Sequence, residues 1–232
     1  MHLQGEKAPI TKGDIVSLYF CPTDFWFAKH GVQPPKGAGM PLWKRFADCE
    51  AQQLSEKGLP PCATGPVAGQ LVKLSLGRPL HQPTMLELRA VPDRGWQLPD
   101  GTHAPLDQKT KPYPLKTVPA YHQLELSYYG LAMSLASLPV ADVGYLLPYV
   151  PSFGHQNGLV TVDGVTLEVP LSLEEAERWL RFAREVLDLG APPDYDWLAD
   201  AADRVLGVTT FPRQWEDCAV CEFVYKAAKY VA

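Results

Sequence analysis

Two carboxylates and one ammonium lie close together in the sequence, in a pattern suited to metal-dependent chemistry on phosphates. Asp93 follows the apolar stretch 85–92, and Asp107 and Lys109 stand two residues apart in the stretch 104–110. Mg²⁺ and Mn²⁺ prefer carboxylate oxygens and leave part of their shell to water and substrate phosphate. A nearby ammonium stabilises the negative charge that develops during phosphoryl chemistry. These three residues therefore predict a metal-dependent phosphodiesterase site.

The predicted geometry depends on two neighbouring strands. The stretch 104–110 is typical of a short strand, so Asp107 and Lys109 should leave the sheet on the same face. A strand that returns after the Gly-, Pro- and Asp-rich turn at 95–105 would place Asp93 beside Asp107. An Asp-x-Lys tripeptide alone is more often a solvated ion pair at a strand edge, which makes the surrounding elements important.

Those surrounding elements are predicted from hydrophobic periodicity. Leu42, Phe46, Cys49 and Leu54 have roughly helical spacing, and Gly58 follows as a stop signal. The predicted order is a helix, three strands, a helix and a strand. Their ranges are 41–57 for the first helix, 71–76, 85–92 and 104–110 for the strands, 120–137 for the second helix and 141–150 for the last strand.

This order, with Pro-Asp after the second strand and Asp-x-Lys on the third, resembles the PD-(D/E)XK nuclease superfamily. The resemblance implies an α/β fold with a restriction-endonuclease-like core (αβββαβ), in which helices flank a mixed central sheet. It implies an N-terminal segment at 1–40 and a nuclease core at 41–150. A C-terminal hairpin and helical region at 151–232 would pack on that core.

Both ends of the chain narrow the resemblance to RecB-like nucleases and the CRISPR-associated adaptation exonucleases. Cys21 is followed by proline and an aromatic cluster, and Cys218 and Cys221 form a late Cys-x-x-Cys. In the iron–sulfur members of that group, an early cysteine joins a late Cys-x-x-Cys and one further cysteine, which the stretch 222–232 lacks. The resemblance implies a [4Fe-4S] cluster or Zn²⁺ held by Cys21, Cys218 and Cys221. Within this chain Cys62, in a loop that could reach, is the expected fourth ligand.

The cysteines leave other interpretations open. Cys49 or an exogenous thiol could supply the fourth ligand instead of Cys62, and all five cysteines could be free and buried. The odd count and the absence of an N-terminal apolar run argue against a structural disulfide framework.

The helix after the lysine resembles the RecB-like helix that carries a Gln and a Tyr towards the active site and the DNA. Gln123 matches the Gln, which implies a supporting catalytic role. The tyrosine is either Tyr128 or Tyr129, because the usual four-residue step from Gln123 reaches Ser127. Both tyrosines could equally be core aromatics.

One further metal ligand is expected from the family's first helix, which supplies a His or Glu. Glu50 is the best-placed match, and Glu87 and His30 are weaker ones. A solvated helix face is the ordinary place for such a Glu. Lys111, directly after the catalytic motif, is expected to line a substrate channel.

The C-terminal part predicts a hairpin and a helix. Asp163-Gly164 is a turn pair within the hairpin 159–171, and a capping box at 172–175 starts a helix that runs to Gly190. Arg178, Arg181 and Arg184 form a basic flank on this helix, which is either a solvated face or a ridge that follows phosphates.

Composition restricts the class of protein without naming its partner. The 232 residues carry a formal net charge of -5, which requires any DNA-binding surface to be a local basic groove. No apolar run is long enough to cross a membrane, so we expect a cytoplasmic protein without a membrane partner.

Together these features predict a Mg²⁺- or Mn²⁺-dependent DNA nuclease. The resemblance implies a RecB-like exonuclease that acts on single strands or DNA ends in recombination, repair or CRISPR adaptation. Asp93 and Asp107 are the predicted metal ligands, and Lys109 is the predicted charge stabiliser. The alternatives are a nuclease-fold subunit that binds DNA ends in a protein complex with little or no catalysis, and a small zinc-stabilised interaction protein.

Overall fold

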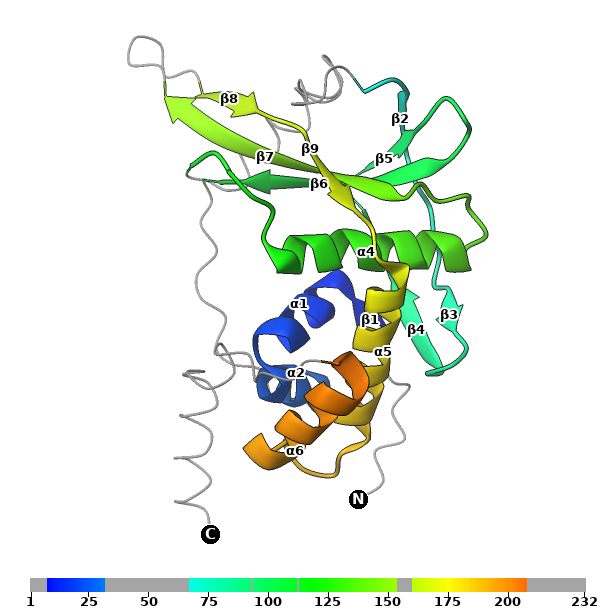
Figure 1. Cartoon of the computed structure of the whole chain (residues 1–232), viewed down its shortest axis with the longest axis vertical. Helices are drawn as coiled ribbons and strands as arrows, with labels where there is room; N and C mark the ends of the chain where they lie inside the picture. The colour runs from blue at the N-terminus through cyan, green and yellow to red at the C-terminus, as the bar shows by residue number, and fades with distance from the viewer. Residues whose placement is uncertain (1–7, 32–66, 93, 112, 154–159, 208–232) are drawn as a thin grey trace. The chain divides into compact units, whose positions relative to one another are not determined.

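The structure is a computed structural model, and it describes residues 8–31, 67–92, 94–111, 113–153 and 160–207, with backbone only for 151–153 and 160–163 (Figure 1). The predicted helix 41–57 lies outside the described residues. The chain divides into two compact units: unit 1 comprises Met1–Lys36, Arg78–Arg89 and Glu174–Ala232, and unit 2 comprises Gly37–Gly77 and Ala90–Leu173. The division at residues 40 and 150 expected from the sequence stays a prediction.

Unit 2 contains a sheet of six described strands in the order β2-β5-β6-β7-β8, with β9 paired to β7 as well. Their bounds are β2 Gln70–Val72, β5 Arg94–Gln97, β6 His103–Thr110, β7 Val143–Phe153, β8 Val160–Gly164 and β9 Leu167–Pro170. The β6–β7 pair is parallel and the other pairs are antiparallel, so the sheet is mixed.

Helix α4 (Ala120–Leu135) connects β6 to β7 and lies along one face of this sheet (Figure 1). Parallel neighbouring strands need such a crossover, because a tight turn cannot join them. The middle of α4 is buried on nearly every side, and Leu126 packs with Leu146 of β7 and Val169 of β9. This contact fixes which residues of β7 face the helix.

The register between β6 and β7 then assigns the faces of β6. Asp107 is opposite Leu146, and Lys109 is opposite Pro148. Residues at the same level of neighbouring strands point to the same side of a sheet. Asp107 therefore faces α4, whereas Leu106 packs with Leu147 in the core cluster on the other side.

Unit 1 combines a small sheet with helices. The sheet has the order β1-β4-β3, and the elements are β1 Ile10–Thr11, α1 Lys12–Phe20, α2 Pro22–Lys29, β3 Leu80–His81, β4 Leu86–Arg89, α5 Leu173–Asp188, α6 Tyr195–Ala201 and the π-helical turn η1 Ala202–Leu206. Tyr19 contacts Trp179 with ring centroids 5.6 Å apart, and Trp26 Nε1 donates to the carbonyl of Leu189 at 3.2 Å. These contacts join α1 and α2 to α5 and its C-terminal end.

The sequence predicted the strand beside β6 incorrectly. The expected strand 85–92 appears as β4, but β4 pairs with β1 and β3. The strand that pairs with β6 is β5, which lies partly in the predicted turn 95–105; Arg94 is opposite Leu106. The expected pairing fails because the chain forms a second, short strand around Trp96 after Asp93, and the turn itself shortens to the residues between Gln97 and His103.

The predicted hairpin at Asp163-Gly164 is also wrong. Asp163 is opposite Val150 and Gly164 is opposite Tyr149, so both lie in the ladder between β8 and β7. β9 pairs with the earlier part of β7, where Leu167 is opposite Leu146. At 11 residues β7 is long enough for both segments to pair with it in succession.

The basic flank on α5 is neutralised by its own helix. Arg178 pairs with Glu174 at 2.8 Å, Arg181 with Glu177 at 3.4 Å and Arg184 with Asp188 at 2.7 Å. Each pair spans four residues, the spacing of neighbouring side chains on a helix surface. The solvated-face interpretation thus fits better than a phosphate-binding ridge.

The described fold is α/β, with mixed sheets and helices. None of its described helices combines the length and the apolar character that crossing a membrane requires.

Candidate metal centre

Asp107 and Lys109 lie on the face of β6 that α4 covers. Lys109 Nζ is 2.8 Å from Asp107 Oδ2, as expected for residues two apart on a strand. The side chain of Asp107 is fully buried, and that of Lys109 is 19% exposed. The pair is therefore not the solvated strand-edge ion pair that the tripeptide alone would suggest.

Two residues of α4 complete this cluster. Glu125 Oε1 accepts a hydrogen bond from Lys109 Nζ at 3.1 Å, and Glu125 Oε2 is 2.5 Å from His122 Nδ1. His122 and Glu125 are three residues apart and therefore lie on the same side of the helix. Both are buried. A continuous chain of contacts runs from His122 through Glu125 and Lys109 to Asp107.

The cluster contains the donor atoms of a metal site. Asp107, His122 and Glu125 each offer one ligand atom, and these atoms lie within 4.8 Å of one another. Two carboxylates suit Mg²⁺ and Mn²⁺, while the imidazole suits Mn²⁺ and later transition metals better than Mg²⁺. The set therefore fits a divalent cation.

The charge of the cluster favours a cation too. With a neutral imidazole, two carboxylates and one ammonium leave one negative charge in a buried place, which is costly unless it is compensated. His122 Nδ1 faces Glu125, and His122 Nε2 has no hydrogen-bond partner among the described residues. A divalent cation would be attracted by this charge, and would change the total from -1 to +1 while the ammonium of Lys109 remained in place.

Lys111 extends the positive charge beyond the cluster. Its Nζ lies 5.9 Å from the centre of the Tyr121 ring and 3.5 Å from the Tyr121 hydroxyl. Tyr121 in turn contacts the His122 ring, with centroids 4.1 Å apart. Through Tyr121, the ammonium of Lys111 is therefore connected to the His122 end of the cluster.

Two of the three residues of α4 carried over from the RecB-like resemblance form hydrogen bonds to other segments of the structure. Gln123 Nε2 donates to the carbonyl of Pro170, at the end of β9. Tyr128 is fully buried, and Tyr129 donates from its hydroxyl to the carbonyl of Val91 at 3.1 Å. This hydrogen bond ties α4 to the segment that leads to Asp93.

Sequence reasoning missed His122 and Glu125. A usable signal existed, because these are two ionisable residues at helical spacing on a helix whose other residues are mostly apolar.

Several predicted ligands lie outside the described residues: Asp93, Glu50, Cys62, Cys218 and Cys221. Cys21 is described and buried. Its Sγ accepts from the backbone N–H of Asp24 at 3.3 Å and so caps the start of α2. This contact gives Cys21 a local structural role at the start of α2. The weaker ligand candidates Glu87 and His30 belong to unit 1.

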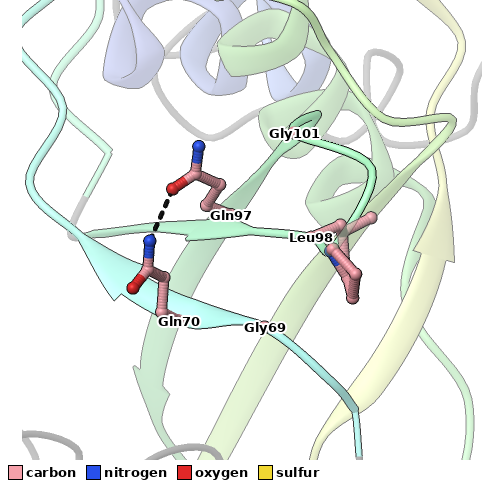
Figure 2. Close-up of a pocket in the computed structure, with 6 residues that line it drawn as sticks. Gly69, Gln70, Gln97, Leu98 and Gly101 are labelled. Carbon is pink, nitrogen blue, oxygen red and sulfur yellow. Dashed lines mark hydrogen bonds between the residues drawn. The ribbon is translucent and has the colours of Figure 1, made fainter.

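A separate pocket of about 340 Å³ lies at the turn between β5 and β6 (Figure 2). Gln70 and Gln97 meet there across the β2–β5 pair, with Nε2 of Gln70 donating to Oε1 of Gln97 at 2.7 Å. Gln97 is opposite His103 of β6, and Asp107 is four residues further along the same strand. At the usual rise of a strand, the backbone positions of His103 and Asp107 are about 13 Å apart. The pocket is thus distinct from the cluster of Asp107, His122 and Glu125.

Comparisons with known proteins add little. No protein-family model matches the sequence, and a search of curated proteins finds no relative. Among solved structures, the chain is similar to SSO0001, with a TM-score of 0.42 and 14% identity over 92% of this chain and 89% of that chain. A similarity of this size assigns neither a family nor an activity.

Proposed function

We propose that this chain is a metal-dependent nuclease that hydrolyses phosphodiester bonds in DNA. The observation that carries the proposal is the position of Lys109, whose ammonium lies between the buried carboxylates of Asp107 and Glu125. A nuclease site of this type needs carboxylates for a cation and an ammonium for the reacting phosphate, and all three groups are present within one small cluster.

The roles follow from the contacts. Asp107 and Glu125 hold the cation, with His122 as a third ligand or as the donor that orients Glu125. Mg²⁺ or Mn²⁺, when bound, supplies a water of lowered pKa as the nucleophile. Lys109 stabilises the negative charge that develops on the phosphate. Lys111 contributes positive charge for the neighbouring part of the nucleic acid backbone.

The proposal also includes a specific fold, the restriction-endonuclease-like core, and a specific family, the RecB-like exonucleases. The order β5, β6, α4 and β7, with an antiparallel first pair and a parallel second pair, supports a restriction-endonuclease-like core. In such a core, the resemblance implies Asp93 as an additional metal ligand. Within this core we favour the RecB-like exonuclease branch.

The test is degradation of end-labelled single- and double-stranded DNA by the full chain in EDTA, Mg²⁺ or Mn²⁺. We expect cation-dependent degradation, and a rate about 10²- to 10³-fold lower for Asp107→Asn and Lys109→Met. Glu174→Gln, on the exposed surface of α5, is the matched control and should retain the rate.

Circular dichroism should confirm that each variant folds. Equal rates for the wild-type protein, Asp107→Asn and Lys109→Met would overturn the nuclease assignment. DNA that is bound but not cut would instead favour the alternative of a DNA-end-binding subunit.

A further inference from the structure

Lys109 contacts the same carboxylates that a cation would use. Its ammonium approaches Oδ2 of Asp107 and Oε1 of Glu125, and two of its three donors can be directed at them. A Mg²⁺ ion bound to Oδ2 at about 2.1 Å would lie within about 5 Å of that ammonium. Two positive groups at that separation, in buried surroundings, repel each other strongly.

The carboxylates are held more firmly than the lysine. Asp107 is fully buried on β6, and the second oxygen of Glu125 is held by His122. The lysine side chain is partly exposed and has a long, flexible stem. If a cation and the ammonium cannot both remain, the ammonium is the group that can move.

We propose that Lys109 and a divalent cation compete for Asp107 and Glu125, and that cation binding releases Lys109 towards the phosphate of the substrate. This inference rests on the proposed metal site and adds a regulatory step to it. The lysine compensates the two carboxylates until the cation arrives, and its release then supplies the ammonium that the reacting phosphate requires. Metal loading and readiness for substrate are thereby coupled.

The first experiment measures Mn²⁺ binding by isothermal titration calorimetry in the wild-type protein and Lys109→Met. Removal of the competing ammonium should tighten binding on the order of tenfold, equivalent to ~1.4 kcal/mol. Lys111→Met is the matched control for a general loss of positive charge, and its affinity should change much less. Equal or weaker binding by Lys109→Met, or an equal gain in Lys111→Met, would refute the competition while leaving the metal site intact.

A second measurement uses the wild-type protein, because Lys109→Met leaves two carboxylates without their counter-ion and can fail to fold. Acetylation of lysines by a limiting amine-reactive ester, read by mass spectrometry, should be slow at Lys109 in EDTA and several-fold faster with saturating Mn²⁺. Lys111 is the internal reference. An unchanged or slower rate at Lys109, under conditions where calorimetry shows Mn²⁺ bound, overturns the inference. If no Mn²⁺ binds to any folded form, both the inference and the proposed metal site fail.

Discussion

Oε1 of Glu125 lies 3.1 Å from the ammonium nitrogen of Lys109, so a carboxylate on α4 completes the ion pair that Lys109 forms with Asp107 within β6. This contact joins the crossover helix to the strand beneath it. It also means that any change to one of the three charges alters the balance of the other two.

The stability of the cluster should show that coupling. Lys109→Met leaves two buried carboxylates uncompensated and should lower the free energy of unfolding by roughly 3 kcal/mol, the lower end of the range for a broken buried pair because the lysine is partly exposed. Adding Glu125→Gln removes one of those charges, so the double variant should be more stable than Lys109→Met alone. Urea denaturation of the two single variants and the double variant measures the coupling. Strictly additive losses would mean that the two side chains do not interact.

Two substitutions of Cys21 distinguish a structural role of this side chain from a metal-binding role. Cys21→Ser keeps a side-chain acceptor for the N–H of Asp24, so the thermal midpoint should fall only slightly, whereas Cys21→Ala should cost about 1 kcal/mol through loss of the cap. If the cysteine also holds a cluster, anaerobically purified Cys21→Ser should lose its iron and visible absorption. Elemental analysis checks this, and a wild-type protein that contains neither iron nor zinc would contradict the predicted cysteine site.

His81 should make stability depend on pH. It is buried on β3, Nδ1 is 2.8 Å from Thr84 Oγ1, and burial lowers the pKa of its imidazole below the ordinary 6.5, more than Glu177 raises it. The unfolded chain therefore binds this proton more readily than the folded protein does. The contribution of the neutral His81 side chain to the free energy of unfolding is therefore fully present above about pH 6.5. It is lost as the pH falls from there through the pKa of His81 in the folded protein.

The measurement is the free energy of unfolding of the wild-type protein and His81→Gln between pH 5 and 8. The wild-type curve should fall more steeply below pH 6.5 than that of the variant. His30→Gln is the matched control, because His30 is exposed. Parallel curves for the wild-type protein and His81→Gln would show that His81 does not contribute.

Gly69 should tolerate a side chain much less well than Gly101. Both have positive φ, +146° and +85° respectively, but an added Cβ at Gly69 would lie 2.4 Å from the carbonyl oxygen of Gln97 and from Trp96 Nε1. An added Cβ at Gly101 meets nothing within 4 Å. We expect Gly101→Ala to cost about 1 kcal/mol from backbone strain and Gly69→Ala to cost clearly more. Denaturation followed by tryptophan fluorescence gives both values, and similar losses would contradict the close approach at Gly69.

Local signals were sufficient for the elements around the cluster. The two-residue spacing of Asp107 and Lys109 in the predicted strand 104–110 indicated that they share a face, and the apolar pattern at 120–137 predicted α4 to within two residues at its end. These are single elements whose own periodicity determines their form. The strand 71–76 was predicted too long, since β2 ends at Val72.

Pairing between strands was not predictable in the same way. β5 has four residues and includes Gly95, so it looked like part of a turn, and its role comes from its partner β6. The α4 residues of the cluster were missed for a similar reason. Glu125 becomes a site residue only because the crossover brings it over Lys109, a contact that no local pattern contains.

The contacts of unit 1 have a consequence for synthesis on the ribosome. Trp26 and the carbonyl of Leu189 that accepts its hydrogen bond are 163 residues apart. At 5–20 residues per second, α5 emerges roughly 10 to 30 seconds after the helices it packs with. During this time the aromatic side chains of α1 and α2 lack their packing partners on α5 and at its C-terminal end. Chaperones that shield nascent chains should therefore bind most strongly to N-terminal fragments that end before α5.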